Sequence, residues 1–560
     1  MPLHLLLLSA LPLLGCIEGQ TSGPTQAEPD DTRPPGGDSG TPENPCPEDA
    51  SLGLATSTGC ILGDRSGALE QWLGVPYAEP PVDALRFART VPISPWTEPL
   101  EADAFGDVCL QADTSGFIPE VYGSEDCLTL NIFRPAGTEA DAALPILFFT
   151  HGGAFTAGAG SLDTYALEPQ LAEQAIVVTH NYRLGAFGFL AHADLSAEDH
   201  TAHGDGGSSG NQGLFDSLAA LQWVVDNASM LGGDPAQLMV FGESAGAMTT
   251  CALLASPMAE DMFSGALLQS AGCGFLEWPL NETEGTGHDF SAEDVGAYIA
   301  YELGCSGSQS VSCLRDLDAE EILDTVSDFD FSPNIDGVFL PMPAREAFAR
   351  GEFNRVPVTA GFNENEGVFF TWMLGIDTDD ALVEALSGVA AYQGWDDPAP
   401  VIEAYTSDAF GSPQQAYDAF YGDLVFACPT LSFLDAVSAH VDARGFLFSE
   451  APDWLQSYPG LEEWGAFHAA ELPFVFGTTP EYFTAPERAL SRVMQAAWVG
   501  TLDAAPSVAE IGAWPLFDAG GGMAADGGTL VEFNAAGSSV TSGVFRERCD
   551  LLRSLGWHTY

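Results

Sequence analysis

Short apolar runs that end close to turn residues recur along the chain. The clearest are Leu144–Thr150 (LPILFFT), Ala175–Thr179 (AIVVT) and Leu238–Phe241 (LMVF), each followed within a few residues by Gly or Asn. Continuous runs of this length predict strands that are buried on both faces of a mostly parallel sheet. Between the last two runs, Gly213–Asn227 repeats its apolar residues at helical spacing and predicts an amphipathic crossover helix. This alternation indicates a layered α/β fold.

The first residues follow a different pattern. Leu5–Leu14 is apolar but too short to span a bilayer, and this length is typical of a secretion signal. Cys16 follows a small residue and predicts the lipidation site of a bacterial lipoprotein, although the leader carries no Lys or Arg. An ordinary signal peptide is the alternative. We therefore expect a signal peptide over residues 1–16 with a lipobox-like end.

Residues 17–50 have almost no large apolar side chain and are rich in Pro, Gly, Thr and acids. Such a segment cannot bury enough surface to fold, so it predicts a disordered tether. Residues 51–560 are then the folded domain. With 46% hydrophobic residues, the 560-residue chain has ample material for a large core.

The net charge of the chain limits which classes of partner it can bind. The chain has 80 acidic residues against 16 basic ones, all of them Arg, and its formal net charge is −64. This balance excludes nucleic acid and anionic membrane surfaces as electrostatic partners. The only expected membrane contact is the N-terminal lipid anchor.

Cysteine usage points to an oxidising compartment. Of 11 cysteines, ten remain when Cys16 is set aside for lipid. An even set in an exported chain predicts disulfides. Zinc is the competing use, but there is no CxxC pair and no His at ligand spacing to a Cys, so no metal is expected.

The strongest chemical signal is Gly242-Glu243-Ser244-Ala245-Gly246, which follows one predicted strand and opens a helix-like stretch. A GxSxG elbow in this context lifts the serine hydroxyl above the sheet. Ser244 is the candidate nucleophile, and a merely structural tight turn is the alternative. Earlier in the chain, His151-Gly152-Gly153-Ala154-Phe155 follows another strand and matches the loop that supplies oxyanion donors in lipases and esterases.

Together these motifs resemble the type-B carboxylesterase and cholinesterase family of α/β-hydrolases. The resemblance runs from about Leu69 to about Leu552. It implies an α/β-hydrolase fold, with a central, mostly parallel sheet flanked by helices and helical insertions over the active site. Further motifs carry it, namely Trp72–Val82, Ser124–Pro135, Asn181–Leu190, Gly210–Asp216, Gly232–Pro235, Leu267–Gly272, Asn363–Gly367 and Gly465–Gly477.

The resemblance assigns the remaining roles. Glu366 stands at the position of the family's catalytic acid, although Asn365 replaces the usual Asp before it, and His468 stands at the position of the base. Glu364 is the rival acid and His440 the rival base. The implied oxyanion donors are the N–H groups of Gly153, Ala154 and Ala245.

The resemblance also implies three disulfides and two salt bridges. The disulfides are Cys109–Cys127, Cys305–Cys313 and Cys428–Cys549, and the salt bridges are Arg86–Glu125 and Arg183–Asp216. Cys46, Cys60, Cys251 and Cys273 remain, and only elimination pairs Cys46 with Cys60 and Cys251 with Cys273.

The resulting hypothesis is an exported serine carboxylesterase that acts on small-molecule esters through an acyl-enzyme and needs no cofactor. Cholinesterases of the family stack choline on a Trp in the first disulfide loop. The loop between Cys109 and Cys127 has no Trp, only Phe117 and Tyr122, which argues against choline esters because cation–π recognition favours Trp. The alternative from another class is a non-catalytic binding module, since some relatives kept the fold after losing the nucleophile.

Overall fold

The computed structural model describes most of the chain beyond the N-terminal region. The described residues are 46–47, 52–113, 120–166, 168–275, 278–281, 283, 290–327, 329–457, 460–518, 528–543 and 545–556. The predicted signal peptide with Cys16, and the predicted tether except for Cys46 and Pro47, lie outside them.

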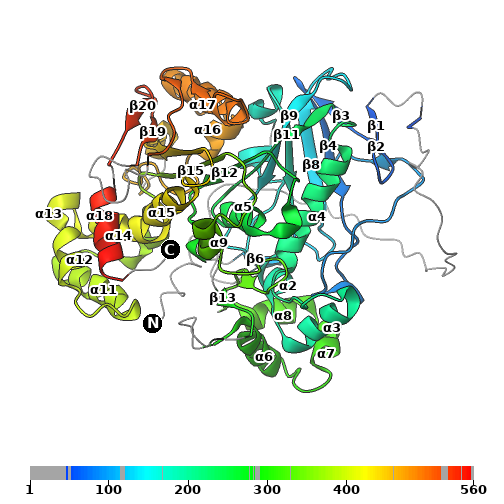
Figure 1. Ribbon diagram of the computed structural model, residues 1–560, viewed down its shortest axis with the longest axis horizontal. Coiled ribbons are helices and arrows are strands. Elements are labelled where there is room, and N and C mark those ends of the chain that lie inside the picture. Colours follow the sequence, from blue (N-terminus) through cyan, green and yellow to red (C-terminus); the bar gives the residue numbers. More distant parts are fainter. Residues whose placement is uncertain are drawn as a thin grey trace.

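A large mixed sheet forms the centre of the molecule (Figure 1). Its pairs from β10 through β9, β11, β12, β15 and β16 to β19 are parallel, and antiparallel strands complete both edges. In spatial order the strands are β20 (Ser539–Thr541), β19 (Leu530–Phe533), β16 (Ala443–Phe448), β15 (Val358–Asn363), β12 (Gly265–Gln269), β11 (Gly233–Glu243), β9 (Leu144–Thr150), β10 (Ile176–His180), β8 (Thr129–Pro135), β4 (Leu69–Pro76) and β3 (Asp64–Ser66).

The predicted strands and crossover helix are confirmed within a few residues, since they correspond to β9, β10, β11 and the helix α4 (Gln212–Asn227). The apolar runs are continuous because both faces of the sheet are buried. In β9, Ile146 and Phe148 pack into one hydrophobic cluster, whereas Leu147 and Phe149 pack into a second.

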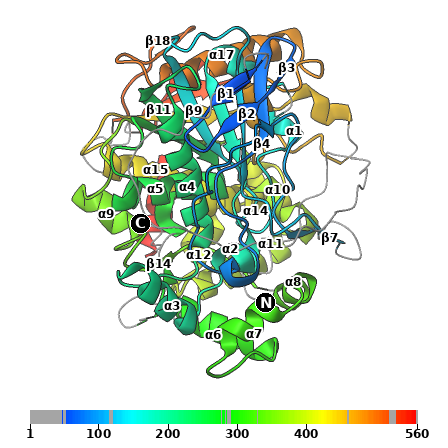
Figure 2. The same cartoon turned by 90° about the vertical axis from the view of Figure 1, so that its right-hand side faces the viewer.

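Helices cover both faces. The first cluster includes α4 and α5 (Ala245–Ala255), and the second includes α16 (Leu472–Phe476) and α17 (Ala485–Gly500). In Figures 1 and 2, α16 and α17 lie away from α4 and α5, with strands of the sheet between them. This arrangement is the α/β-hydrolase architecture that the sequence predicted.

Additional helices and small sheets surround this core. The helices are α1 (Asp163–Ala166), α2 (Gly185–Phe189), α3 (Ala193–His203), α6 (Ala292–Glu302), α7 (Ser310–Asp316), α8 (Ala319–Val326), α9 (Ala344–Arg350), α10 (Val368–Thr371), α11 (Asp379–Tyr392), α12 (Ala399–Ala404), α13 (Ser407–Phe410), α14 (Pro413–Gly422), α15 (Cys428–Val437) and α18 (Arg546–Ser554). The small sheets consist of β1 (Gly53–Ala55), β2 (Cys60–Leu62) and β5 (Leu100–Glu101), β6 (Gln111–Asp113) and β7 (Glu120–Tyr122), β13 (Trp278–Pro279) and β14 (Asn334–Ile335), and β17 (Ser507–Val508) and β18 (Gly512–Ala513).

A turn of π-helix, Asp423–Ala427, joins α14 to α15 into one long helix. Among the described residues this helix, Pro413–Val437, is the one long and apolar enough to span a membrane, and 83% of its most apolar window is buried inside the protein. Such burial is typical of a core helix.

Five disulfides connect the described chain. They include the three pairs that the family resemblance implied and the two pairs obtained by elimination: Cys46–Cys60, Cys109–Cys127, Cys251–Cys273, Cys305–Cys313 and Cys428–Cys549. A set of this size is typical of exported proteins, since reducing compartments keep thiols free.

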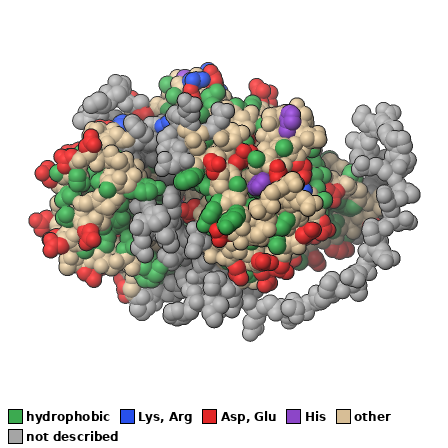
Figure 3. Space-filling view, turned by 90° about the horizontal axis from the view of Figure 1, so that it is seen from below, with side chains coloured by type: hydrophobic (Ala, Val, Ile, Leu, Met, Phe, Trp, Pro, Cys, Tyr) green, Lys and Arg blue, Asp and Glu red, His purple; other side chains and the backbone are tan. Residues whose placement is uncertain are grey.

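Buried ion pairs hold loops against the core. Both expected pairs form, with Arg86 2.5 Å from Glu125 and Arg183 2.8 Å from Asp216. A third pair, Arg548 with the buried Asp423 at 2.6 Å, was not expected from the sequence. The charged side chains of the chain are mainly acidic, and Figure 3 shows Asp and Glu side chains scattered over one face with few basic ones.

Candidate active site

Ser244 lies on a strained turn between β11 and α5. Its backbone has φ 56° and ψ −124°, angles that residues other than Gly rarely adopt. Strain of this kind costs about 1–3 kcal/mol and persists only where the surroundings enforce it. The turn therefore has the geometry of the nucleophile elbow that the sequence predicted.

The two flanking glycines make this turn possible. A Cβ added to Gly246 would lie 1.9 Å from the Thr150 carbonyl oxygen, and one added to Gly242 would lie 2.3 Å from the carbonyl carbon of Gly246. Backbone atoms cannot move away as side chains can, so both positions exclude every larger residue.

The loop after β9 lies directly against the elbow. A Cβ on Gly152 would lie 3.0 Å from Ser244 Cβ, and one on Gly153 would lie 2.1 Å from the Ala157 carbonyl oxygen. Ala154 continues the loop with φ 54° and is exposed. The loop therefore brings its backbone close to the serine.

Three amides near Ser244 are free to donate. Within the described part of the chain, the N–H groups of Gly153, Ala154 and Ala245 make no hydrogen bond to the protein. Ala245 is the first residue of α5, so its N–H belongs to the unsatisfied first turn of a helix. Free backbone donors beside a nucleophile suit a developing oxyanion.

His468 contacts the acid that the family resemblance assigned. Its Nδ1 lies 2.7 Å from Glu366 Oε2, and both side chains are buried. The other oxygen, Glu366 Oε1, accepts a hydrogen bond from the backbone N–H of Asn363 at 2.7 Å. The carboxylate is thus held on both sides and fixes the imidazole ring.

The other ring nitrogen of His468 lies close to a second carboxylate. His468 Nε2 lies 3.1 Å from Oε1 of Glu243, the residue before Ser244 in the chain. No hydrogen bond of the described residues involves the Ser244 hydroxyl. His468 therefore contacts the residue that precedes Ser244 in the chain, and hydrogen bonds at such sites often tighten only when substrate binds.

The pKa values of Glu243 and His468 are both raised, so both groups favour their protonated forms. Burial raises the pKa of Glu243 to about 8, although His468 opposes the shift. Burial alone lowers the pKa of His468, but the carboxylates of Glu243 and Glu366 outweigh it and raise that pKa to about 9. At neutral pH the site holds protons that the same groups would largely lose in water.

A third buried carboxylate, Glu471, completes the site and was not found from the sequence. Burial raises its pKa, and the nearby Glu366 adds to the shift. Its oxygens accept hydrogen bonds from the side-chain amides of Gln269 at 2.8 Å and Asn363 at 2.5 Å. Asn363 therefore binds two acids at once, Glu366 through its backbone and Glu471 through its side chain.

The structure separates the two rival residues from this cluster. His440 is half-buried, and its Nε2 lies 3.4 Å from the Ala349 carbonyl oxygen at the end of α9. Burial raises the pKa of Glu364, and the charges that act on it are those of Glu532 and Arg548. Neither contacts His468, so the geometry favours Glu366 and His468.

Aromatic rings surround the imidazole of His468. The ring centroids of Phe426, Phe370 and Phe369 lie 4.7, 5.0 and 6.0 Å from it. Phe426 comes from the π-helical turn, a local feature that often occurs at functional sites. These rings keep the base in an apolar setting.

The oxyanion loop carries its own buried histidine. Burial lowers the pKa of His151 to about 4, although the bond to the Gly152 carbonyl opposes the shift. The ring stacks on Tyr182 with centroids 4.5 Å apart. Neutral at ordinary pH, it supports the loop without adding charge.

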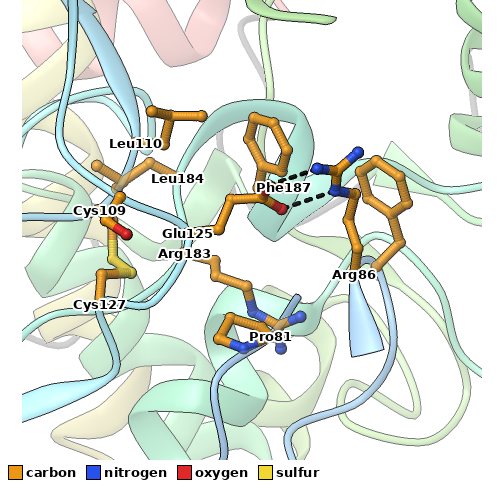
Figure 4. A pocket seen from close by; sticks show the side chains of 11 residues that line it. Pro81, Arg86, Cys109, Leu110, Glu125, Cys127, Arg183, Leu184 and Phe187 are labelled. Carbon is orange, nitrogen blue, oxygen red and sulfur yellow. Dashed lines mark hydrogen bonds and ion pairs between the residues drawn. A yellow bond between two sulfur atoms is a disulfide. The ribbon is translucent and has the colours of Figure 1, made fainter. Parts of the chain in front are cut away.

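A small pocket lies beside the first disulfide loop (Figure 4). Cys109, Cys127, Phe187 and the Arg86–Glu125 ion pair line it. Its lining includes neither Ser244 nor His468, so it is separate from the catalytic cluster.

Comparisons with known proteins agree with this geometry. A model of the carboxylesterase family matches residues 50–500. A para-nitrobenzyl esterase of Bacillus subtilis is 31% identical over 487 residues, covering 83% of this chain and 92% of the relative. An acetylcholinesterase of Bungarus fasciatus is 32% identical, covering 84% and 81%.

Solved structures also show similarity to esterases. A PNB esterase structure superposes with a TM-score of 0.72 at 30% identity, covering 90% of this chain and 99% of the other. With the family model spanning most of the catalytic region, the chain belongs to the carboxylesterase family and is a carboxylic ester hydrolase.

Proposed function

We propose that this enzyme hydrolyses uncharged carboxylic esters, with Ser244 as nucleophile, His468 as general base and Glu366 as the acid that orients it. The observation that supports this most strongly is the 2.7 Å contact between His468 Nδ1 and Glu366 Oε2 beside a strained serine elbow. Nucleophile, base and orienting acid follow the chain order of α/β-hydrolases.

Acylation begins when the Ser244 oxygen attacks the ester carbonyl carbon. His468 Nε2 takes the hydroxyl proton as the new C–O bond forms, and Glu366 stabilises the imidazolium. The carbonyl oxygen becomes an oxyanion that accepts hydrogen bonds from the N–H groups of Gly153, Ala154 and Ala245. When the tetrahedral intermediate collapses, the ester C–O bond breaks and His468 protonates the departing alkoxide.

Deacylation repeats these steps with water. His468 removes a proton from the water as its oxygen attacks the acyl carbon, and the same amides hold the second oxyanion. The bond to Ser244 then breaks, and His468 returns the proton to the serine oxygen, which regenerates the enzyme.

The first disulfide loop supports neutral substrates over choline esters. Phe117 lies outside the described residues. Tyr122 is 46% exposed and donates a hydrogen bond to Gln111 Oε1 at 2.9 Å, so it belongs to a surface hairpin. Without a Trp between Cys109 and Cys127, this loop lacks the best cation–π partner for a quaternary ammonium group.

A fluorophosphonate probe tests the proposed function, because only an activated serine reacts with it. We expect the wild-type enzyme to be labelled at Ser244 and to hydrolyse simple acetates. Ser244→Ala should lose both properties while it keeps the wild-type melting temperature. A wild-type protein that neither labels nor turns over esters would instead be a binding module on a hydrolase fold.

For the N-terminal region we propose a lipoprotein. The signal peptide of residues 1–16 ends before lipid attachment at Cys16, residues 17–50 form the tether, and the catalytic domain of residues 51–560 is held at the cell envelope. Metabolic labelling with a fatty acid in a bacterial host tests this, with Cys16→Ser as the control. Equal labelling of both proteins, or of neither, contradicts the anchor.

A further inference from the structure

A row of aromatic rings leads from His468 to the protein surface. The Phe369 ring lies 6.0 Å from the imidazole, the Trp464 ring lies 6.1 Å from Phe369, and the Trp372 ring lies 5.9 Å from Trp464. These are the separations of rings in mutual contact. We call Phe369, Trp464 and Trp372 the aromatic ladder.

Exposure increases along this ladder. His468 is 5% exposed, Phe369 and Trp464 are half-buried, and Trp372 at the outer end is 42% exposed. Trp372 is followed by Met373, which is 49% exposed, and contiguous exposed apolar side chains, unlike single ones, mark candidate binding surfaces. Because the inner end touches the catalytic imidazole, the outer end is continuous with the active site.

The ladder lies on the alcohol side of the scissile bond. In the proposed mechanism His468 protonates the departing alkoxide, so the alcohol part of the ester must lie beside its imidazole. Rings that continue outward from His468 therefore lie where the alcohol chain can reach them.

Charge around the outer end selects against anions. Glu462 and Glu463 precede Trp464 and are exposed, and the whole chain carries a formal charge of −64. A carboxylated or sulfonated alcohol would be repelled here, whereas a neutral aryl group would stack without an electrostatic cost.

We infer that the aromatic ladder is a binding subsite for neutral alcohols with two successive aromatic rings, the inner ring on Phe369 and the outer ring on the Trp464–Trp372 pair. This inference rests on the proposed function, since it uses His468 as the residue that protonates the leaving alcohol. It makes Trp372 and Trp464 specificity-determining residues outside the catalytic machinery.

The test compares three acetates, so that every substrate forms the same acyl-enzyme. Ethyl acetate has no ring, benzyl acetate has one, and para-biphenylmethyl acetate has two. Trp372→Leu and Trp464→Leu should each lower kcat/KM for the two-ring ester by about twofold to tenfold, the worth of one aromatic contact. Both variants should leave ethyl and benzyl acetate unchanged.

Matched variants separate this effect from a general loss of apolar surface. Tyr301→Leu removes an aromatic ring on α6 that is 66% exposed and should alter no substrate. Trp464→Phe keeps a ring and should restore most of the preference for the two-ring ester. Phe369→Leu, at the inner end, should lower kcat/KM for both aryl acetates.

Two results would overturn the inference. One is an equal change for all three acetates in the Trp372 or Trp464 variants. The other is an unchanged acetate series with a change for ethyl esters of one-ring and two-ring aryl acids, because the ladder would then bind the acyl group. Fluorophosphonate labelling of Ser244 in each variant shows that the proposed function itself holds. If the wild-type enzyme is not labelled, the proposed function fails first.

Discussion

Replacing Glu366 by Gln gives the sharpest test of the catalytic assignment. The substitution keeps the size of the side chain but removes the negative charge 2.7 Å from His468 Nδ1. That charge stabilises the imidazolium that forms when Ser244 gives up its proton. The variant should therefore bind substrate normally and fail mainly in kcat.

The size of the loss follows from the geometry. At an effective dielectric of about 20, opposite charges about 4 Å apart attract by about 4 kcal/mol. Because about 1.4 kcal/mol corresponds to tenfold in rate, complete loss of this attraction would lower kcat by about 1,000-fold. Glu243 still lies 3.1 Å from the other ring nitrogen, so we expect a decrease between about 100-fold and 1,000-fold.

The pH profile adds a second readout. Activity needs a neutral His468, so the rate rises with pH through the pKa of this base, which burial lowers and the Glu243 and Glu366 carboxylates raise to about 9. Without the Glu366 charge this pKa falls, and the rising limb should move to lower pH. Steady-state kinetics on benzyl acetate from pH 5 to 10 measure both effects.

Glu364→Gln is the matched control, since Glu364 is the rival acid in the same loop. The charges that act on Glu364 are those of Glu532 and Arg548 and not that of His468, so its kcat and pH profile should equal those of the wild-type enzyme. The assignment is wrong if Glu364→Gln is the more damaging variant, or if Glu366→Gln keeps activity within about tenfold of wild type, which is about 1.4 kcal/mol.

Three further predictions concern the same molecule. Ser244→Ala should abolish hydrolysis of simple acetates with little change in melting temperature, His468→Ala should abolish it as well, and substantial activity in either one contradicts the proposed triad. In thermal melts the stability of the fold should fall as pH rises from 6.5 to 9. His468, whose pKa is raised from 6.5 to about 9, stabilises the fold fully below pH 6.5 and loses this effect as pH rises through 9, and Glu243, whose pKa is raised from 4.5 to about 8, favours the folded state only when protonated. His468→Ala should show a shallower fall of stability with pH, and equal slopes for variant and wild type refute this origin. Sodium chloride should raise the melting temperature, because it shortens the screening length from about 30 Å at 0.01 M to about 3 Å at 1 M and so weakens repulsion within an acidic surface; a melting temperature that stays level or falls with salt contradicts this.

Local pattern was enough to predict much of the fold. β9 matches its predicted range because every residue of a strand that is buried on both faces must be apolar, so the run and the strand coincide. The elbow was predictable for a similar reason, since Gly242 and Gly246 are both required by backbone contacts within one turn. Glu366 and His468 came from the family resemblance, because nothing in their neighbouring residues indicates a common site.

Other features depend on contacts that no local pattern records. Gln269 and Glu471 are 202 residues apart in the sequence and meet only in the folded sheet. The π-helical turn that carries Phe426 is held by an ion pair between the buried Asp423 and the half-buried Arg548, which come from different helices. Each of these residues has an ordinary local environment in the sequence, so only the tertiary arrangement shows its role.

The three buried carboxylates around His468 are not equally satisfied. Glu366 is bound by His468 and by the N–H of Asn363, and Glu471 is bound by two side-chain amides. Within the described residues, Glu243 Oε1 accepts no hydrogen bond in good geometry, and its close polar contact is the ion pair with His468 Nε2 at 3.1 Å. The next residue, Ser244, has the strained backbone. A buried carboxyl held by this single ion pair and a strained turn at adjacent positions both cost stability. This coincidence at the end of β11 therefore points to the elbow as the catalytic centre on physical grounds that do not depend on the family.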